Sequence, residues 1–394
     1  MKYEWSRRPL GEIASFVSGG TPSKNNPNYW GGTIPWVSAK TMKGTKISTS
    51  DLFITEEGLA KGSKLAPQGS ILLLTRGSGL FNGLPLCFVE SPVAFNQDVK
   101  CIRSKTEISN KYIFYWLMSQ KKFLMAKVGV TGIGAGKFDT DFLANLEVPI
   151  PNKAERDAIV EITDNITDKI SINEHINDNL QQQLLAVFDK LVTAHEICES
   201  VELKTLCAFQ EGYVNPPQTH PEYFDGSVKW LRAVDINESF IIETSRTLTT
   251  CGFESAKKSA LLFQPNTIAI SKSGTIGRLG IISDFMCGNR AVINIRPLNP
   301  TQLPLIYAFL KSKQREFPDL AVGSVQKNLY VSLLEPLQVE LPDAELVSQF
   351  CDIGNRLLKQ MQTNCKENLA LANLRDALLP QLMTGKIDVS DIQP

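Results

Sequence analysis

The sequence lacks several features that define common classes of protein. It contains no run of about 18 apolar residues, the length that a membrane-spanning helix needs, so we expect no membrane span. Residues 1–5 do not form the apolar core of a secretion signal. The three histidines lie far apart and the eight cysteines include no C-x-x-C pair, so no zinc site is predicted. Scattered cysteines are typical of a reducing compartment, and we expect a cytoplasmic protein without a metal ion.

An excess of charge of one sign is also missing, because 41 basic and 41 acidic residues cancel. The charge is nevertheless segregated along the chain. Residues 1–151 carry 18 basic and 11 acidic residues, net +7, and residues 152–196 carry 4 and 9, net −5. Residues 197–342 carry 14 of each, and residues 343–394 carry 5 and 7. This pattern suggests that a polyanion would bind the globular parts, although uneven surface charge without a partner explains it equally well.

What the sequence does contain is an internal repeat. The segments PNYW at 27–30 and PEYF at 221–224 share an offset of 194 residues. Four further pairs follow in the same order, namely GTIPWV at 32–37 with GSVKWL at 226–231, GSI at 69–71 with NTI at 266–268, NQDV at 96–99 with NRAV at 289–292, and LEVPIP at 146–151 with LQVELP at 337–342. The offsets drift from 194 residues at the first pairs to 191 at the last, which indicates small insertions and deletions in the loops of one fold that occurs twice.

Each repeat has short apolar segments bounded by Gly, Pro and Asn. Residues 70–75 and 267–271 are predicted strands, and residues 111–127 and 303–316 are predicted helices. Each half is therefore predicted to be a β-rich α+β domain.

A long amphipathic helix is predicted after each half. Residues 152–192 contain no Gly and no Pro, and Asn152 with Glu155 forms a capping-box pattern. The second copy starts at Asp343. Apolar residues recur at three- and four-residue spacing, at Ile159, Ile162, Ile166, Ile170, Ile176, Leu180, Leu184, Phe188 and Leu191, and at Leu346, Phe350, Ile353, Leu357, Met361, Leu371, Leu374, Leu378 and Leu382. We expect the two helices to pair antiparallel, to bury both stripes and to relate the halves by a pseudo-two-fold axis; two separate helical linkers are the alternative.

The sequence thus divides into four parts, with boundaries at 1–151, 152–196, 197–342 and 343–394. The first and third are the globular halves. The second and fourth are the helices, and a helix of 40 residues spans roughly 60 Å.

A search for enzyme motifs finds two near matches. GIGAGK at 132–137 fails the phosphate-loop pattern, because Thr131 and Phe138 stand where a Gly and a Ser or Thr are needed. NPPQ at 215–218 is similar to the NPP-aromatic motif of adenine methyltransferases, but Gln218 replaces the aromatic residue and no glycine-rich S-adenosylmethionine loop precedes it. We therefore predict no catalytic residue and no cofactor in this chain.

Basic and amide residues on loops recur in both halves. Arg, Lys, Asn and Gln are the residue types that read base edges in the major groove. They are also ordinary surface residues, and Asn96 and Asn289 can instead satisfy backbone groups in a turn. The predicted DNA-binding residues are Lys40, Arg76, Asn96, Gln97 and Lys137 in the first half, and Arg232, Lys272, Arg278, Asn289, Arg290, Lys327 and Asn328 in the second.

Several motifs carry a resemblance to a known family. They are SGGTPS at 18–23, IPWV at 34–37, FNQ at 95–97, SKSGTIG at 271–277 and LLPQLMTGKI at 378–387. In this order, and with a long helix after each half, they resemble the specificity subunit of type I restriction-modification systems over essentially the whole chain.

The resemblance implies a DNA-recognition subunit without catalysis of its own. Two target recognition domains would each read one half of a split site in double-stranded DNA, and the two helices would be the spacer, holding the half-sites about one or two helical turns apart. Family members hold two methyltransferase subunits, which bind S-adenosylmethionine, and can recruit a translocating endonuclease subunit. A protein-binding scaffold, a subunit of a methylation-only complex and an autonomous adenine methyltransferase are the alternatives that the sequence leaves open.

Overall fold

The computed structural model covers residues 1–394, and its described part is residues 5–389 apart from positions 43, 82, 131, 133, 135, 195, 324 and 325. The chain divides into two compact units, residues 1–168 with 372–394, and residues 169–371. Two long helices, α6 (Lys153–Thr193) and α12 (Ala344–Leu382), each contribute residues to both units. Within the described residues, no helix combines the length and the apolar character that a membrane crossing requires.

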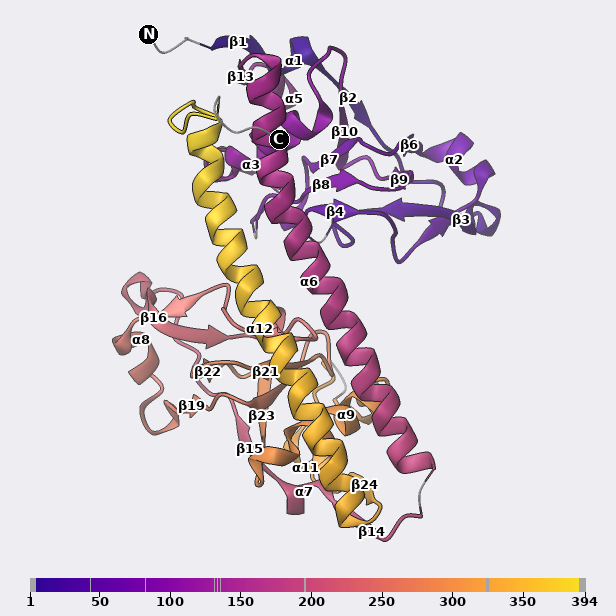
Figure 1. The fold of residues 1–394 in the computed structure, drawn as a ribbon, viewed down its shortest axis with the longest axis vertical. Helices are drawn as coiled ribbons and strands as arrows, with labels where there is room; N and C mark the ends of the chain where they lie inside the picture. The colour runs from indigo at the N-terminus through magenta and orange to yellow at the C-terminus, as the bar shows by residue number, and fades with distance from the viewer. Residues whose placement is uncertain are drawn as a thin grey trace. The chain divides into compact units, whose positions relative to one another are not determined.

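The globular part of the first unit is made of short strands and helices (Figure 1). In chain order these are β1 (Ser6–Pro9), α1 (Leu10–Ile13), β2 (Ala14–Ser18), β3 (Trp30–Val37), β4 (Lys46–Ile47), β5 (Phe53–Ile54), α2 (Glu56–Gly62), β6 (Lys64–Ala66), β7 (Ile71–Leu74), β8 (Leu86–Val89), β9 (Val93–Phe95), β10 (Val99–Ser104), α3 (Asn110–Ser119), α4 (Lys121–Met125), β11 (Gly129–Val130), β12 (Gly136–Lys137), α5 (Thr140–Ala144) and β13 (Glu147–Ile150).

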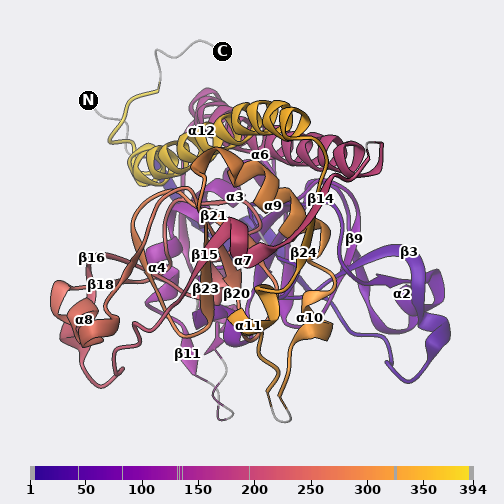
Figure 2. The same cartoon turned by 90° about the horizontal axis from the view of Figure 1, so that it is seen from below.

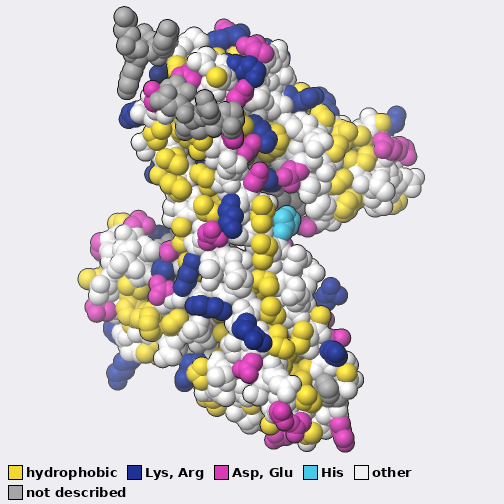
Figure 3. Space-filling view, viewed as in Figure 1, with side chains coloured by type: hydrophobic (Ala, Val, Ile, Leu, Met, Phe, Trp, Pro, Cys, Tyr) yellow, Lys and Arg dark blue, Asp and Glu magenta, His cyan; other side chains and the backbone are white. Residues whose placement is uncertain are grey.

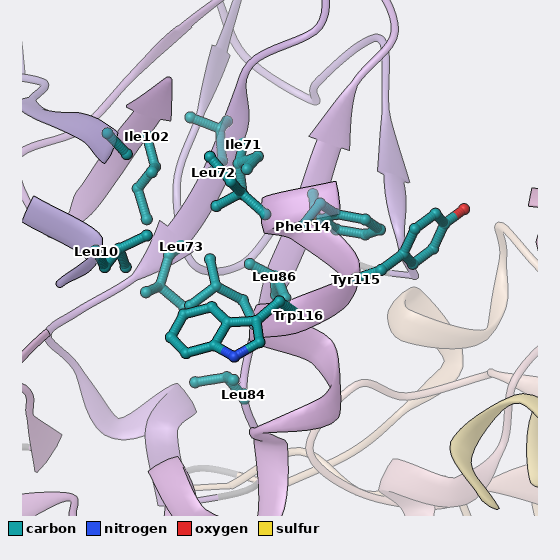
Figure 4. Packing of buried hydrophobic residues seen from close by; sticks show 14 of the residues in the cluster. Leu10, Ile71, Leu72, Leu73, Leu84, Leu86, Ile102, Phe114, Tyr115 and Trp116 are labelled. Atoms are coloured by element: carbon teal, nitrogen blue, oxygen red, sulfur yellow. The ribbon is translucent and has the colours of Figure 1, made fainter. Parts of the chain in front are cut away.

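Two sheets organise this domain. The strands of the larger sheet lie in the order β2-β10-β7-β8-β4, and those of the smaller sheet in the order β5-β3-β9-β6. All four residues of β7, at the centre of the larger sheet, are buried. Helix α3 supplies aromatic side chains to the same core, where Phe114 and Trp116 lie with Leu73 and Leu86 (Figure 4). The predicted strand at 70–75 is confirmed as β7, and the predicted helix at 111–127 is confirmed as α3 followed by α4.

The globular part of the second unit repeats these elements. They are β14 (Glu199–Glu202), α7 (Leu203–Leu206), β15 (Cys207–Glu211), β16 (Phe224–Leu231), β17 (Phe240–Ile241), β18 (Thr247–Leu248), α8 (Thr250–Glu254), β19 (Leu262–Phe263), β20 (Thr267–Ser271), β21 (Leu279–Ile282), β22 (Met286–Gly288), β23 (Val292–Pro297), α9 (Leu303–Ser312), α10 (Phe317–Leu320), α11 (Val331–Leu334) and β24 (Gln338–Leu341). In Figure 2, α9 lies between the larger sheet and the long helices, and its side chains join the core of this unit.

The duplication predicted from sequence is confirmed in the strand topology. The second unit has a five-stranded sheet in the order β15-β23-β20-β21-β17 and a four-stranded sheet in the order β18-β16-β22-β19, which match the two sheets of the first unit strand for strand. An irregularity is repeated as well. The pairing of β3 with β5 shifts register between Trp30 and Ile34, and the pairing of β16 with β18 shifts register between Phe224 and Val228. Each half is an α+β domain with β-rich content, as expected.

Hydrogen bonds confirm individual pairs of the repeat. The indole of Trp36 donates to the carbonyl oxygen of Gly20 at 3.0 Å, and that of Trp230 donates to the carbonyl oxygen of Val214 at 2.7 Å. The donors of the two bonds are 194 residues apart in the sequence, and so are the acceptors, which is the offset of the first sequence motifs. The NPPQ segment therefore belongs to a loop of the repeat, where Gln218 accepts a hydrogen bond from Arg246 at 2.8 Å.

The long helices begin where the sequence predicts. Asn152 and Glu155 form the capping box, with the Glu155 amide donating to Asn152 Oδ1 at 2.9 Å and the Asn152 amide donating to Glu155 Oε2 at 3.2 Å. Asp343 caps α12 by accepting from the Glu345 amide at 2.8 Å. Within residues 169–371 the helices run antiparallel, since Phe188 packs on Phe350 while Asn173 bonds to Asn368.

The expectation that the apolar stripes are buried along their whole length is wrong at several positions. Ile176 is 39% exposed, and Ile353 and Leu374 on α12 are 38% and 48% exposed. The buried positions at the centre include asparagines, with Asn173 donating to Asn368 Oδ1 and Asn364 donating to Asn177 Oδ1, both at 2.9 Å. Periodicity reports which residues share a face of a helix, but the other helix and the domain decide which face is covered.

The asparagine contacts are symmetric within the helix pair. Because α6 begins at Lys153 and α12 at Ala344, the two helices align with an offset of 191 residues. The Asn177 amide donates to the carbonyl oxygen of Met361 at 3.3 Å, and its symmetry mate, the Asn368 amide, donates to that of Ile170 at 3.2 Å. The predicted pseudo-two-fold relation is thus present at this place.

Candidate nucleic-acid interface

Three segments of the first half meet at the end of β7. The Thr75 amide donates to the carbonyl oxygen of Asp98 at 2.8 Å, and the Phe138 amide donates to that of Thr75 at 2.9 Å. Arg76 pairs with Lys137 in an isolated antiparallel bridge. The loop after β7, the turn before β10 and the hairpin β11–β12 are thereby held together. We name this place the first junction (residues 75–77, 96–98 and 136–138).

The second half builds the same junction. The Lys272 amide donates to the carbonyl oxygen of Ala291 at 2.7 Å, and the Leu329 amide donates to that of Lys272 at 2.9 Å. The second junction is therefore residues 272–274, 289–291 and 327–329. Its equivalent positions are offset by 197, 193 and 191 residues, the offsets found in the sequence motifs.

The junctions gather most of the residues that the sequence singled out. Arg76, Gln97 and Lys137 are exposed at the first junction. At the second, Arg290 and Lys327 are exposed, while Lys272, Asn289 and Asn328 are partly buried. Arg278 follows close by, because its amide donates to Ser271 Oγ at 2.8 Å. Of the segment GIGAGK, positions 133 and 135 lie outside the described residues.

The side chains of Asn96 and Asn289 each bind a backbone amide in a turn, which was the alternative to DNA contact in the sequence analysis. Asn96 Oδ1 accepts from the Asp98 amide at 3.2 Å, and Asn289 Oδ1 accepts from the Ala291 amide at 3.0 Å. Asn96 is only 7% exposed. Both side chains shape the turn that presents Gln97 and Arg290, and a direct contact of either with DNA stays a prediction.

Two of the predicted DNA-binding residues, Lys40 and Arg232, lie outside both junctions. Lys40 is exposed and lies after β3, in a turn in which the Thr41 amide donates to the carbonyl oxygen of Ser38. Arg232 lies at the end of β16, where it bonds to Ser245 at 2.5 Å, lies 3.6 Å from Asp235 and stacks over Trp230.

The two junctions differ in how their cations are balanced. Lys272 is bound to Glu211 at 2.8 Å and lies over the ring of Tyr330. Burial raises the pKa of Glu211, but the hydrogen bonds from Lys272 and Tyr213 outweigh burial and hold the pKa below its usual value, so Glu211 stays ionised. The equivalent of Glu211 in the first half is Ser18, a neutral residue, which accepts from Lys100 at 2.6 Å. Lys272 at the second junction is thus paired with a carboxylate, whereas Lys100 beside the first junction is paired with a neutral hydroxyl group.

Sequence reasoning missed Lys100 and Arg246. Lys100 lies in β10 and is brought to the first junction only by the pairing of β10 with β2 and β7. Arg246 lies over the ring of Phe224 at 4.1 Å and contacts Trp230, so it adds a second cation to the face that carries Arg232. Neither residue lies in a motif, and only the strand pairing could have indicated them.

The site contains no arrangement that points to metal chemistry. Within residues 5–389, leaving aside the positions not described, no group of three His, Cys, Asp or Glu side chains could hold a metal ion. The chemistry that both junctions offer is hydrogen bonding and positive charge.

Known proteins are similar to this chain in sequence and in fold. The family model for the type I restriction modification DNA specificity domain matches twice, at residues 2–182 and 196–364. The specificity subunit of the type I restriction enzyme EcoR124I/EcoR124II from Escherichia coli is 37% identical over 163 residues, which are 41% of this chain and 40% of that protein. The chain therefore spans less than half of the length of this relative in that match.

Two further similarities extend over nearly the full length. The specificity subunit of the type I restriction enzyme MjaIX from Methanocaldococcus jannaschii is 24% identical over 99% of this chain and 95% of that protein. The crystal structure of the S subunit of a type I restriction-modification system from M. genitalium is similar with a TM-score of 0.52 at 16% identity, over 97% of this chain and 96% of that one, and shows the fold alone. With both of its halves matched by the same family model, the chain belongs to the family of type I restriction-modification specificity subunits.

Proposed function

We propose that the chain is the non-catalytic DNA-recognition subunit of a type I restriction-modification complex. Each globular half would bind one part of a bipartite target in double-stranded DNA. The observation that carries this proposal is the junction built twice from the same three segments, at 75–77, 96–98 and 136–138, and at 272–274, 289–291 and 327–329. A duplicated backbone frame with different side chains is what reading two different half-sites requires.

The side chains at the two junctions support unequal half-sites. Arg76 and Lys137 at the first junction correspond to Ser273 and Asn328 at the second. Arg can contact guanine bidentately, Lys also binds phosphate, and Asn pairs with adenine. The net charge of +7 on residues 1–151 favours stronger phosphate contact by the first half.

Methyltransferase subunits are the partners that we propose for the long helices. Ile172 and Ile176 on α6 are 53% and 39% exposed, and Figure 3 shows hydrophobic side chains lined up along the long helices. Exposed apolar patches of this kind mark protein–protein contacts. We propose two such subunits, which would bind the S-adenosylmethionine, and a translocating endonuclease subunit as a further partner.

Co-expression with a methyltransferase subunit, followed by mapping of methylated adenines, tests the proposal. We expect one split motif, with one half lost or altered when Arg76 and Lys137 are both changed to Ala. Lys313→Ala, a change in a lysine paired with Glu316 on the surface of the second half, is the matched control. If the modified sites contain no split motif, the proposal fails.

A salt titration separates DNA recognition from a protein-binding scaffold. Phosphate contacts release counterions, so the DNA affinity of the assembled complex should fall steeply with salt. An affinity that does not change with salt would favour the scaffold. Binding of S-adenosylmethionine by the isolated chain would favour an autonomous methyltransferase instead.

A further inference from the structure

The second junction continues into a chain of four side chains. Glu211, at the end of β15, accepts hydrogen bonds from Lys272 Nζ at 2.8 Å and from the Tyr213 hydroxyl at 2.9 Å. The Lys272 ammonium also lies 4.8 Å from the centre of the Tyr330 ring. Tyr330 directly follows Leu329, which belongs to the junction. We name this group the tyrosine cluster (Glu211, Tyr213, Lys272 and Tyr330).

The charged members of the cluster are largely covered, whereas its rings are open to solvent. The side chains of Lys272 and Glu211 are 14% and 21% exposed. Tyr213 and Tyr330 are 49% and 39% exposed. One exposed ring is common on a protein surface, but here one ion pair connects two of them beside the junction. Tyrosines held in this way offer a large apolar contact area that is already ordered before a ligand binds.

The hydrogen bonds of the cluster leave the rings, and not its charges, available to a ligand. Glu211 uses one carboxylate oxygen for Lys272 and the other for Tyr213. The bond to Glu211 raises the pKa of Tyr213, so the hydroxyl stays protonated and remains a donor to this carboxylate. The charge of Lys272 is balanced by the same carboxylate. The surface that the cluster presents is therefore aromatic.

The first half has no counterpart of Tyr213. Glu211 is equivalent to Ser18, and Val214 is equivalent to Gly20, because these two residues accept the indole hydrogen bonds described above. Two residues lie between Glu211 and Val214, but only one lies between Ser18 and Gly20. Tyr213 is therefore an insertion that only the second half carries.

The other members of the cluster are also different in the first half. At an offset of 191 residues Tyr330 aligns with Asp139, whose side chain caps α5 by accepting from the Asp141 amide. At an offset of 197 residues Lys272 aligns with Thr75, which is neutral. A contact that the tyrosine cluster makes with DNA would thus separate the two half-sites.

We propose that the rings of Tyr330 and Tyr213 contact thymine methyl groups in the half-site that the second half reads, an inference that rests on the proposed function. Glu211 and Lys272 are positioning residues that hold the two rings. A carboxylate beside the rings repels phosphate, which favours contact with base edges. Among these edges the apolar group in the major groove is the thymine methyl, and apolar side chains recognise it by contact.

Deoxyuridine tests this contact, because it pairs with adenine as thymine does and lacks only the methyl group. The full chain is assembled with its methyltransferase subunit, and affinity is measured for the mapped target with single thymines replaced by deoxyuridine. The second half-site is the one that the double variant of Arg76 and Lys137 leaves unaltered. Replacement of a contacted thymine there should weaken binding about fourfold, the effect of losing one buried methyl group.

Ring variants should remove this response to deoxyuridine. Tyr330→Ala combined with Tyr213→Ala should bind the thymine duplex more weakly and should bind the thymine and deoxyuridine duplexes equally. Tyr330→Phe combined with Tyr213→Phe keeps both rings and should keep the response. Lys313→Ala, the control used above, should leave it unchanged. Deoxyuridine in the first half-site should have the same effect on the unaltered chain and on the alanine variant.

The positioning role has a separate readout. Lys272→Met and Glu211→Gln remove a charge but keep both rings. Because thymine and uracil carry the same charge, a role in electrostatics alone would change the affinity for both duplexes by the same factor. If these residues position the rings, each variant should also reduce the response to deoxyuridine, from about fourfold toward no difference.

The possible failures are distinguishable. Equal affinity of the unaltered complex for the thymine duplex and for every deoxyuridine duplex of the second half-site overturns the inference, and so does a second half-site without an A·T pair. A response that persists in the double alanine variant also overturns it. In each case a split motif in the methylation map leaves the proposed function intact. Absence of a split motif in the unaltered complex overturns the proposed function itself. The first comparison needs no variant, so it decides the inference even where a variant does not assemble.

Discussion

The two halves differ at three buried or closely packed positions where the long helices face the globular domains. At Phe350, Gly354 and Leu358 the second half is apolar, and the aligned residues of the first half are Ile159, Thr163 and Thr167. Both threonines are buried, at 1% and 3% exposure, so this difference lies inside the protein and not on its surface. The repeated backbone therefore carries two kinds of packing at these helix positions, and the contribution of each to stability can be measured.

The largest expected effect is at Phe350. This side chain is 3% exposed and packs on Phe188, so Phe350→Ala should destabilise the second half by about 3–5 kcal/mol. Tyr115→Phe, which removes only the hydroxyl that donates to Asp164, should cost the first half roughly 1–2 kcal/mol. Hydrogen exchange resolved by segment in a urea series measures both. A loss for Tyr115→Phe as large as that for Phe350→Ala would show that the hydroxyl does more than donate one hydrogen bond.

The asparagine centre should show a smaller contrast, because its hydrogen bonds obey the local symmetry except at Glu367. Asn177→Leu removes the acceptor of the buried Asn364 amide and should cost about 1–3 kcal/mol. Its counterpart Asn368→Leu should cost less, since Asn173 keeps Glu367 as an acceptor at 2.8 Å. The double variant Asn177→Leu with Asn364→Leu should recover most of the loss, as measured by thermal unfolding. If the loss of stability in the double variant equals the sum of the losses in the two single variants, the hydrogen bond between Asn364 and Asn177 is not the cause.

The junctions should differ in their salt dependence. Lys137→Ala removes one exposed cation and should reduce the slope of log affinity against log salt by about 1. Lys272→Ala should reduce it less, because Lys272 already binds Glu211. DNA titrations of the assembled complex at several salt concentrations give the slopes, with Lys313→Ala as the control. The same reduction for both variants would show that Glu211 does not compete with phosphate.

The smallest effect is the response to acid. The pKa of Glu211 is lowered in the folded protein, so its pairing stabilises the second half above pH 4.5, the usual value, and this contribution is lost as the pH falls through the lower folded value. Ser18 cannot titrate, so the first junction should lack this response. Hydrogen exchange of β15 and β2 as a function of pH measures it, and Glu211→Gln should abolish the response of β15. An acid response that persists in Glu211→Gln would assign the titration to another group.

Sequence patterns predicted the repeat and the helix starts correctly because both are local. Capping by Asn152 and Asp343 depends on residues two or three positions away, and each offset of the repeat was confirmed by an equivalent hydrogen bond. The candidate site was found only in part. Arg76 and Lys137 were named, but Lys100 reaches the same junction through strand pairing, which no pattern of spacing contains.

The sequence alone determined that the chain is duplicated, that a long helix follows each half, and which family it belongs to, because motifs, caps and offsets are written in consecutive residues. Only the tertiary structure decided which face of each helix is covered, that asparagines hold the centre of the pair, and that Thr167 lines a cavity where Leu358 fills a core. The reason is physical: burial is a property of two surfaces together, and a periodic stripe describes only one of them.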